Sequence, residues 1–218
     1  MPWVSANFAS VSEASEKRTP PPAMMTGFLA FFTYWLWRST GDLVRGAEKT
    51  AKTQLRAYVF LKNVQLLKIF DKYGASIVAY RVMVEWQNTG KTPTRKARTN
   101  INYEISEKDL PKEFSFPDSD VIRYATFGPN QTVSSEGIEI HLVDVEHIST
   151  GARNLHIWGW VEYNDVFDNT PRHRTEFSNR VLIRGEPRLN VPLLWEMQPT
   201  ENHNGSDDEC FRKATSLE

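Results

Sequence analysis

The chain has 218 residues, 40% of them hydrophobic and 24% charged, a globular composition that excludes wholesale disorder and fibrous repeats. The 26 Lys and Arg residues balance 27 Asp and Glu residues, so no positive surplus favours nucleic-acid binding. Cys210 is the single cysteine, which excludes an internal disulfide and a cysteine-based zinc site. The length accommodates one domain with appendages.

The first 38 residues divide into a polar tail and an apolar segment. Residues 1–22 are small and polar and end in three prolines, which predicts a flexible tail. No charge occurs from Ala23 to Trp37, and aromatic residues gather at the end of this run. This pattern predicts a transmembrane helix over 23–38, with the lipid bilayer as its partner. A buried core helix over 23–37 is the main alternative, ahead of an in-plane helix or a cleaved signal peptide.

Residues 39–56 continue as a charged helix. Leu43, Ala47, Ala51 and Leu55 recur every four residues, which gives a narrow apolar stripe. We expect a solvated helical stalk, with weak self-association along the stripe as the alternative.

The charges beside the apolar segment predict its orientation. Two cations precede it, Lys17 and Arg18, and five follow it up to residue 56. Because cytoplasmic flanks are enriched in Lys and Arg, we expect the rest of the chain to face the cytoplasm. An unpaired Cys210 agrees with a reducing compartment.

From Ala57 to about Arg184 the pattern changes to a period of two, which is typical of β-strands, and we expect a β domain over 57–198. The clearest strand places Val78, Tyr80, Val82, Val84 and Trp86 on one face. Further strands are predicted over 58–70, 94–105, 133–143, 154–163 and 175–183. Because no helical crossovers separate them, we predict a mainly β fold, an immunoglobulin-like antiparallel β-sandwich. Disorder is expected over 199–218, where the sequence becomes polar.

Motifs for nucleotide or metal chemistry are weak. Gly90-Lys91-Thr92 resembles the end of a phosphate-binding loop, but Glu85 replaces its first glycine and Pro93 precedes a strand rather than a helix. We expect a hairpin turn there instead. The five histidines have no paired spacing, so neither a metal nor a cofactor is predicted.

Four residues of the β domain are candidates for an interaction face: Trp158, Trp160, Asp165 and His173. The two tryptophans share a strand face, which is either a binding platform or part of the core. Asp165 and His173 lie across a loop and are expected to form a charge-assisted pair. A catalytic Asp–His pair is the alternative, but no serine or cysteine nucleophile accompanies it. No catalytic residue is therefore assigned.

The layout also resembles a known group of proteins. The segments Leu55–Val59, Val84–Pro93, Gly159–Phe167 and His173–Phe177 follow one hydrophobic segment. This order is similar to that of uncharacterised bacterial single-pass membrane proteins with a C-terminal immunoglobulin-like β domain. The resemblance implies a non-enzymatic interaction module in the bacterial inner membrane, with an unidentified protein partner and no catalytic residues to carry over. The alternatives are a small hydrolase that uses Asp165 and His173, and a soluble structural protein.

Overall fold

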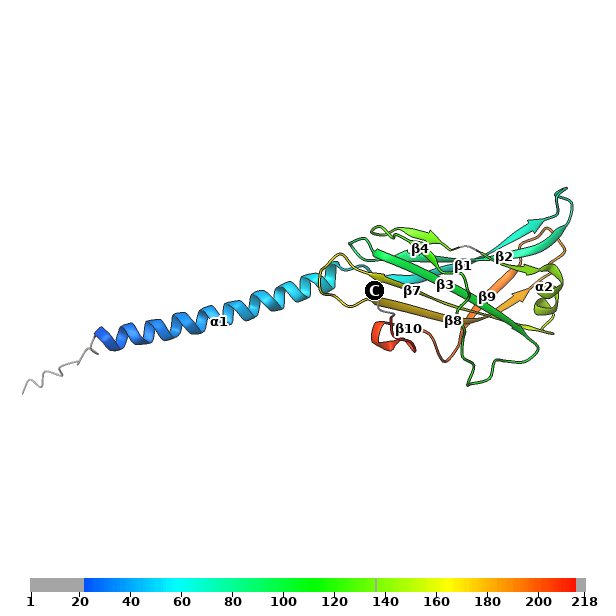
Figure 1. Ribbon diagram of the computed structural model, residues 1–218. Coiled ribbons are helices and arrows are strands. Elements are labelled where there is room, and N and C mark those ends of the chain that lie inside the picture. The colour runs from blue at the N-terminus through cyan, green and yellow to red at the C-terminus, as the bar shows by residue number, and fades with distance from the viewer. Residues whose placement is uncertain (1–21, 136, 215–218) are drawn as a thin grey trace, which may run out of the picture. The chain divides into compact units, whose positions relative to one another are not determined.

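The computed structural model describes residues 22–135 and 137–214 (Figure 1). Almost all of the predicted tail, residues 1–22, lies outside this part of the chain. Two compact units make up the chain, residues 1–49 and residues 50–218.

Helix α1 runs without a break over Pro22–Leu55. Proline suits the first helical turn, because its missing N–H would have no partner there. Eight apolar side chains of the run lie more than half exposed: Phe28, Leu29, Phe31, Phe32, Tyr34, Trp35, Leu36 and Trp37. This exposure does not support the alternative of a buried core helix. Within residues 22–135 and 137–214, no helix combines the length and the apolar character that crossing a membrane requires.

The first sheet of the β domain is built around one central strand. Strand β2 (Ile77–Asn88) pairs along one edge with β1 (Val59–Phe70). Its other edge is shared by two short strands, β5 (Thr132–Ser134) and β6 (Ile138–His141). All three pairings are antiparallel.

The second sheet has the strand order β10-β8-β7-β3-β4, and β9 also pairs with β8. Its members are β3 (Arg95–Ser106), β4 (Arg123–Ala125), β7 (Asn154–Asn164), β8 (His173–Arg184), β9 (Leu194–Pro199) and β10 (Gly205–Ser206). Every pairing is antiparallel. The predicted mainly β, antiparallel fold is therefore confirmed.

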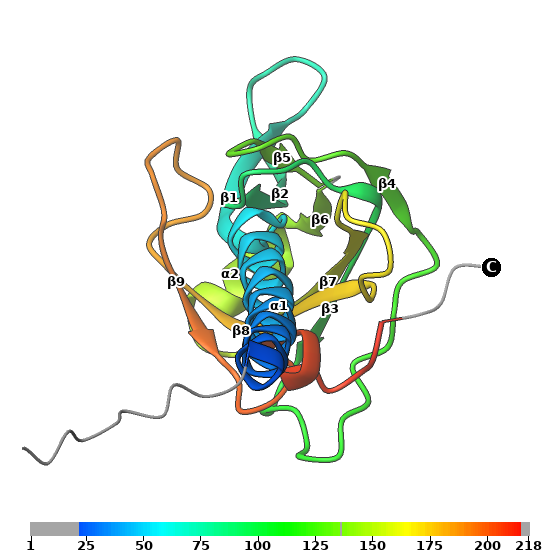
Figure 2. The ribbon, with the colours of Figure 1, turned by 90° about the vertical axis from the view of Figure 1, so that its left-hand side faces the viewer.

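The two sheets share one hydrophobic core. Figure 2 shows β1 and β2 on one side of the domain and β7 and β8 on the other. Side chains from both sheets form a single buried cluster, in which the ring centroids of Trp86 and Phe177 lie 5.5 Å apart. The Trp86 side chain has no exposed surface. This arrangement fits a β-sandwich.

Two local predictions were wrong. A strand was expected over 133–143, but the chain forms β5 and β6 and then helix α2 (Leu142–Ser149). The buried residues of α2, Val145 and Ile148, lie three apart, which is a helical spacing. Val78 was expected in the core but is 44% exposed. A β-bulge explains this, because Ile77 and Ala79 both pair with β1 and leave Val78 between them.

The Gly90 turn is not a hairpin, because β2 and β3 belong to different sheets. The backbone passes so close to the end of α1 that a Cβ atom on Gly90 would lie 2.1 Å from the carbonyl oxygen of Arg56. The next element after Gly90 is strand β3, not a helix. The glycine therefore allows close backbone packing against the segment between α1 and β1.

Candidate functional site

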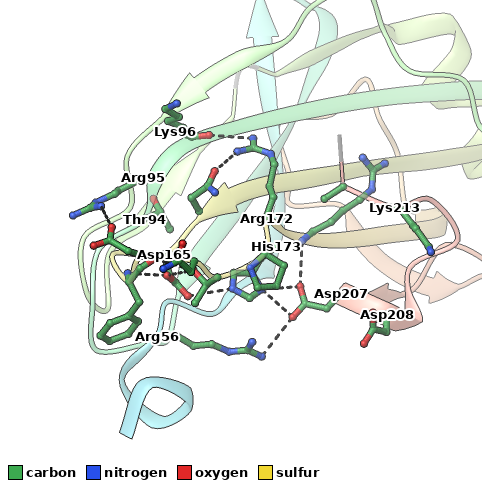
Figure 3. A pocket seen from close by; sticks show the side chains of 18 of the residues that line it. Arg56, Thr94, Arg95, Lys96, Asp165, Arg172, His173, Asp207, Asp208 and Lys213 are labelled. Atoms are coloured by element: carbon green, nitrogen blue, oxygen red, sulfur yellow. Dashed lines mark hydrogen bonds and ion pairs between the residues drawn. The ribbon is translucent and has the colours of Figure 1, made fainter. Parts of the chain in front are cut away.

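An open, polar pocket of about 1160 Å³ lies at one end of the β domain (Figure 3). We call it the polar pocket. Its described lining comes from the residue after α1, the start of β3, the residue after β4, the loop between β7 and β8, the start of β8, the 3-10 helix η1 (Asp207–Glu209) and the residues that follow η1. The charged lining residues are Arg56, Arg95, Lys96, Asp165, Asp168, Arg172, His173, Arg174, Asp207, Asp208 and Lys213.

His173 lies between two carboxylates in this pocket. Its Nε2 atom is 3.3 Å from Oδ2 of Asp165, and its Nδ1 atom is 3.0 Å from both carboxylate oxygens of Asp207. The side chains of His173 and Asp165 are almost fully buried, and that of Asp207 is 33% exposed. The predicted pair of Asp165 and His173 therefore lies within contact distance, and Asp207 is a third member that the sequence did not indicate. We call these three residues the His173 clamp.

Asp165 also holds the loop between β7 and β8. Its Oδ1 atom accepts hydrogen bonds from the backbone N–H of Phe167 at 2.9 Å and from the hydroxyl of Thr170 at 2.7 Å. An aspartate that bonds to the backbone two residues later is a common turn-forming element. Asp165 therefore fixes the loop and orients His173 at the same time.

The clamp geometry favours a structural role over the hydrolase alternative. A histidine that acts as a general base needs one ring nitrogen free for the proton of a nucleophile, but both nitrogens of His173 face carboxylates. No serine or cysteine is among the described residues that line the polar pocket. Ser178 lies outside that lining, with its backbone N–H bonded to the Asn204 side chain.

Cys210 lies close to the pocket but is not an activated thiol. Its Sγ atom donates to the carbonyl oxygen of Arg174 at 3.3 Å. Burial, reinforced by the charge of Glu176, raises the pKa of the thiol to about 12. Because the thiolate is the reactive form, this cysteine is a poor nucleophile at neutral pH.

The two candidate tryptophans occupy the face of the second sheet opposite the shared core, which we call the outer face. Neither alternative from the sequence describes them, because Trp158 and Trp160 are 4% and 5% exposed without belonging to the core cluster. A loop of the same chain covers them. The indole N–H of Trp158 donates to the carbonyl oxygen of Pro117, and that of Trp160 donates to Oδ1 of Asp118, both at 2.8 Å.

Next to the tryptophans, the outer face carries a buried charge network. Glu162 has no exposed surface. Its Oε2 atom accepts from Nη2 of Arg98 at 2.8 Å and from Nε of Arg172 at 3.1 Å, while Oε1 accepts from Nη1 of Arg174 at 2.6 Å. Arg174 also donates to Glu176 at 2.6 Å and lies over the ring of Trp160. Strand pairing brings Arg98 and Arg174 to either side of Glu162, a long-range register that no local pattern reveals.

The expected disorder over 199–218 is wrong for residues 199–214. Strand β10 pairs with β8, and Asn204 bonds to the backbone of Ser178 on the same strand. The His203 ring lies between Phe116 and Phe211, with centroid distances of 4.5 and 4.4 Å. A polar segment is thus ordered by edge pairing and aromatic contacts, not by a core of its own.

One carboxylate and one imidazole of this segment, those of Asp207 and His203, have shifted pKa values. Burial raises the pKa of Asp207, but the hydrogen bond and charge of His173 outweigh it, so that the pKa is lowered. Burial lowers the pKa of His203, although Glu176 opposes the shift. At neutral pH these shifts favour an ionised Asp207 and a neutral His203.

Comparison with known proteins finds no matching family model, no matching curated protein and no matching solved structure. Among residues 22–135 and 137–214, no three His, Cys, Asp or Glu side chains cluster in a way that could hold a metal ion. The function is therefore inferred from α1, the polar pocket and the His173 clamp.

Proposed function

We propose that this chain is a non-enzymatic recognition module that α1 attaches to a lipid bilayer. The observation that carries the proposal is the exposure of the aromatic run in α1, where Trp37 is 74% and Phe28 62% exposed. Exposed apolar surface of this extent marks an interaction site. Tryptophan and tyrosine favour the interface between lipid and water, which makes a bilayer a suitable partner for residues 23–38.

The rest of the proposal follows the charges and the fold. The cations that follow the run favour a β domain on the cytoplasmic side of a bacterial inner membrane. Two antiparallel sheets around a buried Trp86 support an immunoglobulin-like domain. Such domains bind partners through loops at one end of the sheets, which is where the polar pocket lies.

Flotation of the full chain with phosphatidylcholine–phosphatidylglycerol vesicles tests the attachment. The wild-type chain is expected to rise with the vesicles, and the triple variant Phe28→Ser, Phe32→Ser, Trp35→Ser to stay in the lower fractions. The matched control is Leu43→Ser with Val44→Ser, which changes exposed apolar residues of the same helix beyond the aromatic run. If the wild-type chain does not float, or if the triple variant floats equally well, the proposal is wrong.

A further inference from the structure

Some charged residues of the polar pocket are paired within the domain, and others are available to a ligand. Arg172 and Arg174 bind the buried Glu162. Asp165 and Asp207 face His173. These four charges are held within the domain and are not available to a ligand in full.

The remaining lining is mainly cationic. Arg95 has only a distant contact, 3.9 Å, with Asp168, whose side chain is 94% exposed. The ammonium groups of Lys96 and Lys213 have no ion-pair or hydrogen-bond partner among residues 22–135 and 137–214, and both side chains are exposed. Apart from Asp168, the one further acidic residue of the described lining that is not in the clamp is Asp208.

Arg56, the residue that follows α1, adds a fourth cation to the pocket lining. Its Nη2 atom is 3.5 Å from Oδ2 of Asp207. A dashed line in Figure 3 marks this contact. The Arg56 guanidinium also lies over the ring of Tyr58. The buried Nε atom of Arg56 has no hydrogen-bond partner in the described part of the chain. A carboxylate that entered the pocket would therefore find guanidinium and ammonium donors from several separate elements.

We infer that the polar pocket binds an acidic segment of a partner protein, through Arg56, Arg95, Lys96 and Lys213. This inference rests on the proposed recognition role and specifies the partner. Arginine matches the planar geometry of carboxylates, and lysine adds a charge that can follow a mobile side chain. A concave pocket of about 1160 Å³ fits a protruding chain segment better than a planar bilayer surface.

The test is calorimetric titration of the full chain with hexaglutamate in zwitterionic detergent, where no lipid headgroup competes. Binding is expected for the wild-type chain, with an affinity that falls as the salt concentration rises. The double variant Lys96→Gln, Lys213→Gln is expected to bind about tenfold more weakly, since it loses two charge contacts of the kind that set affinity in such sites.

The matched control is Lys108→Gln with Lys112→Gln, which removes the same charge from exposed positions outside the pocket lining. It should bind hexaglutamate like the wild-type chain. The inference is overturned if the wild-type chain does not bind hexaglutamate, or if both double variants weaken binding equally. It is also overturned if the pocket variant leaves hexaglutamate binding intact but loses binding to phosphatidylglycerol vesicles, because the ligand would then be a lipid headgroup. Because detergent replaces lipid, failure here leaves the flotation result unaffected.

Discussion

Replacing Glu162 with glutamine would remove a buried carboxylate that contacts Arg98, Arg172 and Arg174 together. The side chain has no exposed surface, and its contacts to these three residues are 2.6–3.1 Å long. Glutamine keeps the shape but turns one acceptor into a donor that faces guanidinium donors. Either the contact with Arg174 or the contacts with Arg98 and Arg172 would then be lost, depending on which end of the amide faces them.

The cost of that loss is expected to be large. Removing one partner of a buried ion pair typically destabilises a protein by about 3–5 kcal/mol. Domains of this kind are stable by about 5–15 kcal/mol, so Glu162→Gln would remove about a fifth or more of the total. With an ordinary urea dependence, the midpoint of unfolding would fall by about 2 M.

Urea unfolding of the full chain, followed by circular dichroism of the β domain, measures this change. The control is Glu139→Gln, which breaks the pair of Arg81 and Glu139 on an exposed strand where the Glu139 side chain is 56% exposed. Exposed pairs contribute less than about 1 kcal/mol, so the control should unfold like the wild-type chain. If Glu162→Gln also unfolds within 1 kcal/mol of the wild-type chain, a threshold typical of surface changes, the network does not stabilise the fold.

Three further predictions concern the core, the His173 clamp and the thiol. Trp86→Ala should lower the free energy of unfolding by about 3–5 kcal/mol, because it removes a fully buried ring that contacts Phe177. A variant that unfolds at the same urea concentration as the wild-type chain would contradict this. Because the pKa of Asp207 is lowered in the folded chain, its ionised form stabilises the fold above the unfolded pKa near 4, and this contribution is lost as the pH falls through the lower folded value. Asp207→Asn should therefore cost about 1–3 kcal/mol at pH 7, and the difference from the wild-type chain should shrink below about pH 4 in acid unfolding curves. The pKa of the Cys210 thiol is about 12 instead of 9.0. Cys210 should therefore react with iodoacetamide about a thousandfold more slowly than a thiol with an unshifted pKa. If it reacts as fast in the folded chain as in the urea-unfolded chain, the thiol is not buried.

The long strands of the fold were predictable because their alternation is local. Strands β2 and β7 have an apolar residue at nearly every second position of one face, which already defines a buried face. Helix α2 was missed because Val145 and Ile148 give too few helical repeats to overrule a neighbouring strand pattern. The bulge at Val78 depends on how β1 pairs with β2, which a single strand does not reveal.

The candidate site also contains one contact that the sequence predicts and one that it does not. Asp165 and His173 are eight residues apart on either side of one loop, so their contact followed from local turn chemistry. Asp207 reaches His173 from a polar segment 34 residues later in the chain. Composition alone predicts disorder for such a segment, because its order depends on the edge of β8 and on the aromatic rings of a distant loop.

The order of synthesis gives the segment of residues 200–214 a further significance. Strands β7 and β8 leave the ribosome before the residues that pair with β8 and supply Asp207. Until those residues emerge, the nascent chain presents an open strand edge and a histidine with one carboxylate instead of two. Open edges are sites of wrong pairing between chains. Pairing of β10 with Thr175 and Glu176 therefore covers a part of the β8 edge that would otherwise be open to another chain.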